Sequence, residues 1–253
     1  KPDEVYNLAG QSSVALSFEQ PVETLESITV GTLNLLEAIR FLGRDIRFYN
    51  ANSSECFGDA GEIAADERTP FRPRSPYAVA KSAAFWEVDN YREAYGLYAC
   101  SGILFNHESP LRPERFVTQK IVRAACRIAA NKQGMLKLGN LSIQRDWGWA
   151  SEYVDAMWRM LQQVKAEDYV IATGETSRLE DFVAEAFRLV GLDWRDHVES
   201  DPALLRPTDL KIGRANPEKA REKLGWVADS KMKDVVRQMV AVAQEEINIH
   251  GGP

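Results

Sequence analysis

The stretch that decides the fold is Ile-Arg-Phe-Tyr-Asn-Ala-Asn-Ser-Ser-Glu-Cys-Phe-Gly at residues 46–58, followed by Ser-Pro-Tyr-Ala-Val-Ala-Lys at residues 75–81. The first part opens with a short apolar run, which predicts a buried strand. The second part opens a helical pattern over Pro76–Tyr95, with Ser75 as the expected N-cap and Gly96 as the stop. A strand that leads through a polar loop into a helix is the repeating unit of an α/β fold.

The chain on either side repeats this alternation. We expect strands at Val5–Ala9, Ile46–Ala51 and Tyr98–Phe105, and helices at Glu23–Phe41 and Phe116–Asn131. Parallel neighbours need crossover connections, so the order predicts a parallel sheet covered on both faces.

Beyond about Gly134 the expected elements become shorter and their order less regular. They are strands at Met135–Leu138 and Tyr169–Ala172, and helices at Ser151–Val164, Leu179–Val190, Asn216–Gly225 and Lys233–Ile247. We expect a smaller mixed α/β lobe here, interleaved with the end of the sheet, so residues 1–134 and 135–253 form the two predicted parts.

Composition limits the classes of function. The 253 residues are 45% apolar, which suffices for a substantial core, and the net charge of −6 with a pI near 5.3 argues against a nucleic-acid partner. Three cysteines and three histidines show no metal-ligand spacing, so no metal is expected. Neither a run of about 18 apolar residues nor a secretory leader is visible, so we expect no membrane span and a cytoplasmic protein.

The chemistry centres on Tyr77 and Lys81, four residues apart and therefore on one helix face. A nearby ammonium favours the phenolate, so we expect the pKa of Tyr77 to fall toward neutrality. Ser53 ends the preceding strand, and Glu55 follows at its carboxyl end, where open α/β sheets bind ligands. The alternatives are a core tyrosine with a snorkelling lysine, and a solvated carboxylate in a turn.

Ser53, Tyr77 and Lys81 resemble the Ser/Thr-Tyr-Lys triad of the extended short-chain dehydrogenases/reductases. Epimerases of that family have a neutral residue at the position of Glu55, whereas dehydratases have glutamate. The dTDP-glucose dehydratases have aspartate just before it. Asn52-Ser53-Ser54-Glu55 is instead similar to the Ser-Thr-Ser-Glu of GDP-mannose 4,6-dehydratases. Further segments resemble that branch: Tyr6–Ser12, Asn106–Pro110, Phe116–Thr118, Arg145–Gly148, Asp168–Thr176 and Arg206-Pro207.

The resemblance implies a lyase that uses NADP to convert GDP-mannose to GDP-4-keto-6-deoxymannose. Tyr77 would take the proton of the C4 hydroxyl while hydride passes to NADP. Glu55 would remove the C5 proton and protonate the departing C6 hydroxyl, after which hydride returns to C6. Two alternatives remain: another nucleotide-sugar epimerase or 4-keto reductase of this fold, or a nucleotide-sugar-binding module without turnover.

The resemblance also assigns ligand contacts. The catalytic set is Ser53, Glu55, Tyr77 and Lys81; NADP would contact Leu8, Ala9, Gln11, Tyr77, Lys81 and Asn106; GDP-mannose would contact Ser12, Ser54, Asn106, Val117, Lys120, Arg145, Arg206 and Asp209. Arginine suits the diphosphate because its fork pairs with two oxygens. From the residues alone, Arg145 beside Asp146 could be an ion pair only, Lys120 a solvated helix face, and His107 a structural histidine.

Several positions depart from the family pattern. Ser13, Gln119, Trp149 and Asp209 replace the residues usual there, and such changes would alter the pocket for the sugar. No Gly-x-x-Gly-x-x-Gly strand–turn–helix occurs, so the chain resembles an incomplete Rossmann-type doubly wound sheet that starts at the fourth strand. We expect the strand at Val5–Ala9 to lie at an edge, this stretch to be inactive by itself, and the protein to form a homodimer or higher homo-oligomer.

Overall fold

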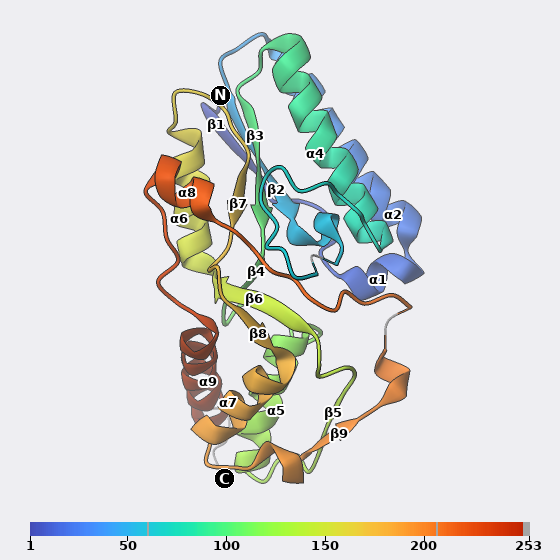
Figure 1. The fold of residues 1–253 in the computed structure, drawn as a ribbon, viewed down its shortest axis with the longest axis vertical. Coiled ribbons are helices and arrows are strands. Elements are labelled where there is room, and N and C mark those ends of the chain that lie inside the picture. The colour runs from blue at the N-terminus through green and yellow to red at the C-terminus, as the bar shows by residue number, and fades with distance from the viewer. Residues whose placement is uncertain (60, 206, 250–253) are drawn as a thin grey trace.

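A four-stranded parallel sheet forms the larger lobe of the computed structural model, which describes residues 1–59, 61–205 and 207–249 (Figure 1). Its strands are β1 (Glu4–Asn7), β2 (Arg47–Ser53), β3 (Ala99–Leu104) and β7 (Tyr169–Ile171), in the order β1-β2-β3-β7. Asn7 lies opposite Asn50, and Asn50 lies opposite Ser101. The parallel sheet predicted from the sequence is confirmed, and β1 lies at one end of this order.

Helices cover both faces of this sheet. One face carries α2 (Pro21–Leu25), a π-helical turn (Glu26–Val30), α3 (Gly31–Leu42) and α4 (Pro76–Tyr95). Phe48 and Ala99 of the strands pack there against Leu36, Ile39, Val88 and Tyr91. The other face carries α6 (Ala150–Leu161) and α8 (Glu218–Leu224), where Tyr49 and Cys100 pack against Met157 and Leu224. The expected helix over Glu23–Phe41 therefore contains a π turn, and α1 (Val14–Glu19) before it was not predicted.

The ends of α4 and α8 follow their capping residues. The Ser75 hydroxyl accepts the Ala78 N–H at 3.1 Å, and Gly96 ends α4 with a φ of 67°. Asn216 Oδ1 accepts the Glu218 N–H at 3.1 Å, and Gly225 ends α8 with a φ of 60°. Glycine adopts this left-handed backbone without the steric cost that a Cβ brings. These local signals place Tyr77 in the first turn of α4.

The smaller lobe is built on α5 (Val117–Ala129), α7 (Leu179–Leu189) and α9 (Met232–Ile249), which share one apolar core. Two small sheets complete it: β4 (Asn106–Glu108), β6 (Gln144–Trp149) and β8 (Thr176–Arg178), and the pair β5 (Leu136–Leu138) and β9 (Val198–Ser200). Short 3-10 turns occupy Trp194–Asp196 and Pro202–Leu204, and a third, Ser54–Phe57, follows β2 of the main sheet. The core of α5 is shared with α7 and α9, whereas β7 and α6 pack with the main sheet; the division of the chain at residue 134 stays a prediction.

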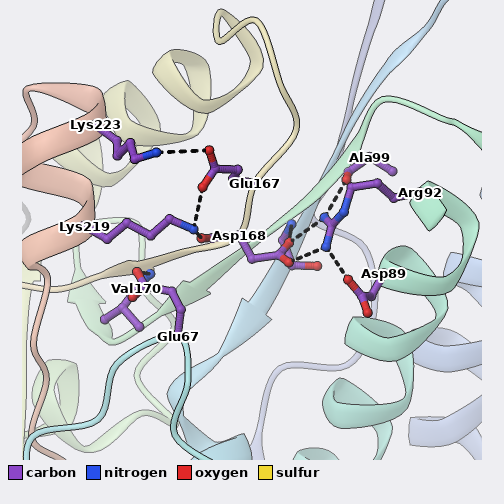
Figure 2. Close-up of polar contacts among 10 residues, drawn as sticks. Glu67, Asp89, Arg92, Ala99, Glu167, Asp168, Val170, Lys219 and Lys223 are labelled. Carbon is purple, nitrogen blue, oxygen red and sulfur yellow. Dashed lines mark hydrogen bonds and ion pairs between the residues drawn. The ribbon is translucent and has the colours of Figure 1, made fainter.

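A network of charges fixes the start of β7 (Figure 2). Asp168 accepts two bonds from the Arg92 guanidinium, at 2.7 and 3.1 Å, and one from the Ser101 N–H at 2.6 Å. Glu67 accepts the Val170 N–H at 2.7 Å. Glu167 pairs with Lys219 and Lys223 of α8. The network joins α4, β3, β7 and α8 at the end of the sheet where β7 begins.

Candidate functional site

The carboxyl end of β2 and the first turn of α4 bring the predicted triad together. Tyr77 is 9% exposed, and its phenol forms a hydrogen bond with the Ser53 side chain. Lys81 is buried one turn further along α4, with Nζ 5.8 Å from the Tyr77 ring centroid and 2.7 Å from the Ala51 carbonyl oxygen. The proximity predicted from the sequence spacing is therefore present in the fold.

The electrostatics of this pair differ from the expectation. Burial raises the pKa of Tyr77 above its ordinary value, so the predicted fall in this pKa is wrong for the chain by itself. Burial also lowers the pKa of Lys81 to about 8, and its ammonium donates to the Ala51 carbonyl rather than to the phenol. The loss of hydration outweighs the nearby positive charge, which sequence spacing could not reveal.

Glu55 lies in the 3-10 turn that follows β2. The Ser53 hydroxyl accepts the Glu55 N–H at 3.3 Å and caps this turn. The Glu55 carboxylate is near enough to the phenol to raise the pKa of Tyr77 by its negative charge. A carboxylate and a phenol therefore belong to the same region of the fold, and they offer two separate proton acceptors.

Arg112 is a residue near the site that the sequence reasoning missed. Its positive charge lowers the pKa of Tyr77, opposing the effect of burial. The side chain is held by Glu108, 2.5 Å from Nε, and donates to the His107 carbonyl at 2.8 Å. Burial raises the pKa of Glu108 to about 7, and the ion pair with Arg112 opposes that shift. The only sequence signal was its position four residues after Glu108, between the segments Asn106–Pro110 and Phe116–Thr118 that resemble the family.

His107 belongs to the packing of this loop. Its Nδ1 lies 2.9 Å from the Phe105 carbonyl oxygen, and its ring stacks on Tyr153 with centroids 4.6 Å apart. Burial lowers the pKa of His107 to about 4, which keeps the ring neutral near pH 7. These contacts favour the structural reading of this histidine.

Arg145 and Asp209, both predicted to contact the nucleotide part, lie side by side. Arg145 of β6 is 6% exposed, and its guanidinium lies 3.2 Å from Asp209 and 2.9 Å from the Gln144 carbonyl oxygen. Asp146 instead accepts the Thr173 and Gly174 N–H groups at 2.9 and 2.8 Å. The alternative in which Arg145 serves only to pair with its neighbour Asp146 is therefore wrong.

The other predicted contacts within the described residues lie on four segments. Val117 and Lys120 lie in the first turn of α5, where Lys120 Nζ donates to the Lys137 carbonyl at 2.7 Å. Asn106 lies on β4, opposite Trp147 of β6. Leu8, Ala9, Gln11 and Ser12 follow the carboxyl end of β1, and Ser54 follows that of β2. Arg206 lies outside the described residues.

The backbone turns sharply after the carboxyl end of β1, at a position that requires glycine. Gly10 has a φ of 110°, and a Cβ there would come within 2.7 Å of the Ile28 side chain. Leu8 and Ala9 are exposed, so the backbone of this segment can be approached by another molecule. Lys81 has three N–H groups, of which the Ala51 carbonyl takes one. These features fit a nucleotide cofactor that lies across the strand ends.

The described residues bear on two properties, the binding of a metal ion and the crossing of a membrane. Residues 1–59, 61–205 and 207–249 contain no cluster of histidine, cysteine and acidic side chains that could hold a metal ion. Within the same residues, no helix combines the length and the apolar character that crossing a bilayer requires.

Comparison with known proteins settles the family. The sequence profile described as GDP-mannose 4,6 dehydratase matches residues 1–239. The chain belongs to the GDP-mannose 4,6-dehydratase family. It is 53% identical over 244 residues to GDP-mannose 4,6 dehydratase 1 of Arabidopsis thaliana, a match that covers 95% of the chain and 67% of the relative. It is 49% identical to the GDP-mannose 4,6-dehydratase of Sinorhizobium fredii, over 95% of the chain and 74% of the relative.

Similarity to solved structures supports the expected α/β fold of the chain. A structure titled RMD from Pseudomonas aeruginosa complexed with NADPH has a TM-score of 0.89 at 24% identity, covering 97% of the chain and 82% of that protein. The UDP-glucose 4-epimerase of Thermus thermophilus, in complex with NAD, has a TM-score of 0.84 at 27% identity, over 96% and 78%. The chain thus spans about two thirds to four fifths of the proteins it matches, and it shares their α/β architecture.

Proposed function

We propose that the protein dehydrates GDP-mannose to GDP-4-keto-6-deoxymannose, with NADP as its resident cofactor. The observation that carries this proposal is the position of Glu55 beside the buried group of Ser53, Tyr77 and Lys81. A triad of this kind serves the oxidation of a hydroxyl, and an adjacent carboxylate adds a base for elimination. The names of the relatives support the same substrate and reaction.

The cofactor fits the residues at the ends of β1 and β2. Lys81 and the backbone beside Gly10 would hold its nicotinamide ribose, with Leu8, Ala9, Gln11 and Asn106 as further contacts. Bound NADP supplies the acceptor for a hydride from C4 and the donor of the same hydride to C6. The reaction therefore has no net redox change and needs no other oxidant.

Tyr77 acts on the C4 hydroxyl. Its phenol, held by the Ser53 side chain, takes the proton of that hydroxyl as C4 is oxidised. Burial raises the pKa of Tyr77, so its phenolate form depends on positive charge close by, and Arg112 and Lys81 are the cations of this region. We therefore assign Arg112 an electrostatic role in this step.

Glu55 acts on the next two atoms of the sugar. The C4 ketone acidifies the C5 proton, which the Glu55 carboxylate removes. The resulting carboxylic acid then protonates the C6 hydroxyl, which leaves as water. Glu55 can serve both steps because it returns to its starting protonation state. When hydride returns to C6, C5 takes up a proton from solvent, and Tyr77 releases to solvent the proton that it took from the C4 hydroxyl, so both groups end as they began. An amide at this position can do neither.

Arg145 and Asp209 recognise the GDP part. The Arg145 guanidinium has five N–H groups, and Asp209 and the Gln144 carbonyl accept from two of them. The remaining groups can pair with two diphosphate oxygens in the fork geometry that arginine favours. Asp209 would receive a ribose hydroxyl. Val117, Lys120, Ser12 and Ser54 complete the proposed contacts.

The test is an incubation of the protein, with its full natural sequence, with GDP-mannose and NADP. A 4-keto, 6-deoxy product identified by mass spectrometry and NMR supports the proposal. A product that keeps its C6 hydroxyl indicates an epimerase, and tight GDP-mannose binding without turnover indicates a binding module. No turnover of GDP-mannose, together with reduction of a 4-keto sugar nucleotide in a parallel incubation with NADPH, indicates a reductase. Each of these three results contradicts the dehydratase assignment.

A further inference from the structure

A segment that crosses the middle of the molecule, residues 207–216, joins the two lobes; we call it the strap (Figure 1). On one side it is bonded to β6, the strand that carries Arg145. The Gln144 N–H donates to the Lys211 carbonyl at 2.8 Å, and the Gly213 N–H donates to the Gln144 carbonyl at 2.9 Å. Asp209, which pairs with Arg145, is part of the strap. The strap therefore belongs to the proposed nucleotide site.

The opposite side of the strap is bonded to the segments that carry the catalytic residues. Asp59 Oδ1 accepts both the Lys211 N–H, at 2.6 Å, and the Ile212 N–H, at 3.2 Å. The Thr208 hydroxyl donates to the Arg74 carbonyl at 2.5 Å. Asp59 lies four residues after Glu55, and Arg74 lies three residues before Tyr77. The strap therefore forms hydrogen bonds close in sequence to Glu55 and to Tyr77, the two groups proposed to move protons in the reaction.

The connection from Glu55 to Asp59 is short and has little freedom. The Gly58 N–H donates to the Glu55 carbonyl at 3.2 Å, which closes the 3-10 turn. Gly58 has a φ of 72°, and a Cβ there would clash with the Arg72 carbonyl oxygen. The Arg72 N–H donates in turn to the Cys56 carbonyl at 2.8 Å. A displacement of Asp59 is therefore passed to the turn that carries Glu55.

We propose that Asp59 is a positioning residue, which couples nucleotide binding at Arg145 and Asp209 to the placement of Glu55 through the strap. This inference rests on the proposed function. Two N–H groups of the strap converge on a single oxygen of Asp59, so the position requires an acceptor at that point. An asparagine carbonyl can supply the same acceptor, whereas alanine cannot.

The variants Asp59→Ala and Asp59→Asn, made in the protein with its full natural sequence, test whether catalysis requires a hydrogen-bond acceptor at this position. We expect kcat of the alanine variant to fall about tenfold, equivalent to about 1.4 kcal/mol, with KM changing less. The asparagine variant should recover most of this loss. Thr208→Val, which removes the second bond to the catalytic segments, should lower kcat in the same direction.

The matched control is Asp193→Ala. Asp193 is also an exposed aspartate whose Oδ1 accepts a backbone N–H, that of Arg195 at 3.0 Å, but it caps a 3-10 turn of the smaller lobe. The kcat of the Asp193→Ala variant should equal that of the wild type. An Asp59→Ala variant with unchanged kcat, or an asparagine variant as impaired as the alanine variant, would overturn the proposal.

Hydrogen exchange tests the coupling without turnover. In the wild type, GDP should slow amide exchange both in the strap and in residues 53–58. In Asp59→Ala, GDP should still slow exchange in the strap but no longer in residues 53–58. Protection that reaches residues 53–58 in this variant contradicts the coupling. A wild type that binds GDP with this pattern but forms no 4-keto product refutes the proposed function alone.

Discussion

Replacing Arg145 by alanine should weaken GDP binding far more than it weakens the fold. Arg145 is 6% exposed, and two of its five N–H groups are taken by Asp209 and the Gln144 carbonyl. The others remain for the diphosphate. Hydrogen bonds to charged groups contribute about 1.5–3 kcal/mol, so the loss corresponds to an affinity lower by roughly 10- to 150-fold.

The cost to stability should be much smaller. Asp209 keeps 24% of its side chain exposed, so water can solvate it once its partner is gone. Partly exposed ion pairs contribute about 1 kcal/mol or less. Arg145→Lys keeps the charge but loses the fork, so its GDP affinity should lie between those of the wild type and the alanine variant.

Calorimetric titration with GDP, beside urea denaturation, measures both effects. Arg159→Ala is the matched control, because Arg159 also pairs with an aspartate, Asp155 at 2.8 Å, and donates to a backbone carbonyl, that of Gly225 at 2.9 Å. This control should keep the wild-type affinity for GDP. Unchanged affinity in Arg145→Ala together with a lower free energy of unfolding would show that Arg145 is only a structural ion pair.

Three further predictions address the triad and the network of Figure 2. Tyr77→Phe should lower kcat by about 10²- to 10⁴-fold and stop the reaction before hydride moves; rapid NADP reduction on mixing would contradict this order. Burial lowers the pKa of Lys81 from 10.5 to about 8, so its ammonium destabilises the folded state below pH 8, and this cost is relieved as pH rises to about 10.5. Lys81→Met should therefore raise the free energy of unfolding at pH 7 by up to about 3 kcal/mol, with the gain shrinking above pH 8 in urea titrations. Asp168→Ala removes the acceptor of the Ser101 N–H and one of the acceptors of Arg92, which keeps Asp89 and the Ala99 carbonyl. It should lower the free energy of unfolding by about 2–3 kcal/mol, whereas a change below about 0.5 kcal/mol would show that water replaces the Asp168 carboxylate.

The parts of the fold that follow local rules could be predicted from the sequence. Ser75 and Gly96 bound α4 because the first caps free N–H groups and the second adopts a left-handed backbone. The apolar runs of β2 and β3 are long enough to read as buried strands. The four-residue spacing of Tyr77 and Lys81 then fixed their common face on α4, and the end of β2 fixed Ser53 beside them.

Features that depend on distant partners could not be predicted in this way. β4, β8 and β9 have three residues each and exist as strands only because of the strands they pair with. The pairing of Arg145 with Asp209 joins residues 64 positions apart. The pKa of Tyr77 depends on how much water the fold removes from the phenol and on the charge of Arg112, 35 residues away in the chain, and neither can be read from the spacing of Tyr77 and Lys81. Asp59 accepts hydrogen bonds from backbone N–H groups, and backbone donors leave no recognisable pattern in the amino-acid sequence.

The most direct test of the account is rapid mixing of a Glu55→Gln variant, with its full natural sequence and bound NADP, with GDP-mannose. Tyr77 is intact in this variant, so oxidation at C4 should proceed and NADPH fluorescence should rise and persist. Elimination should fail because no group removes the C5 proton, so 4-keto-6-deoxy product should be absent and solvent deuterium should not enter C5. Product formation at a rate near that of the wild type would contradict the assignment of Glu55 as the base for dehydration.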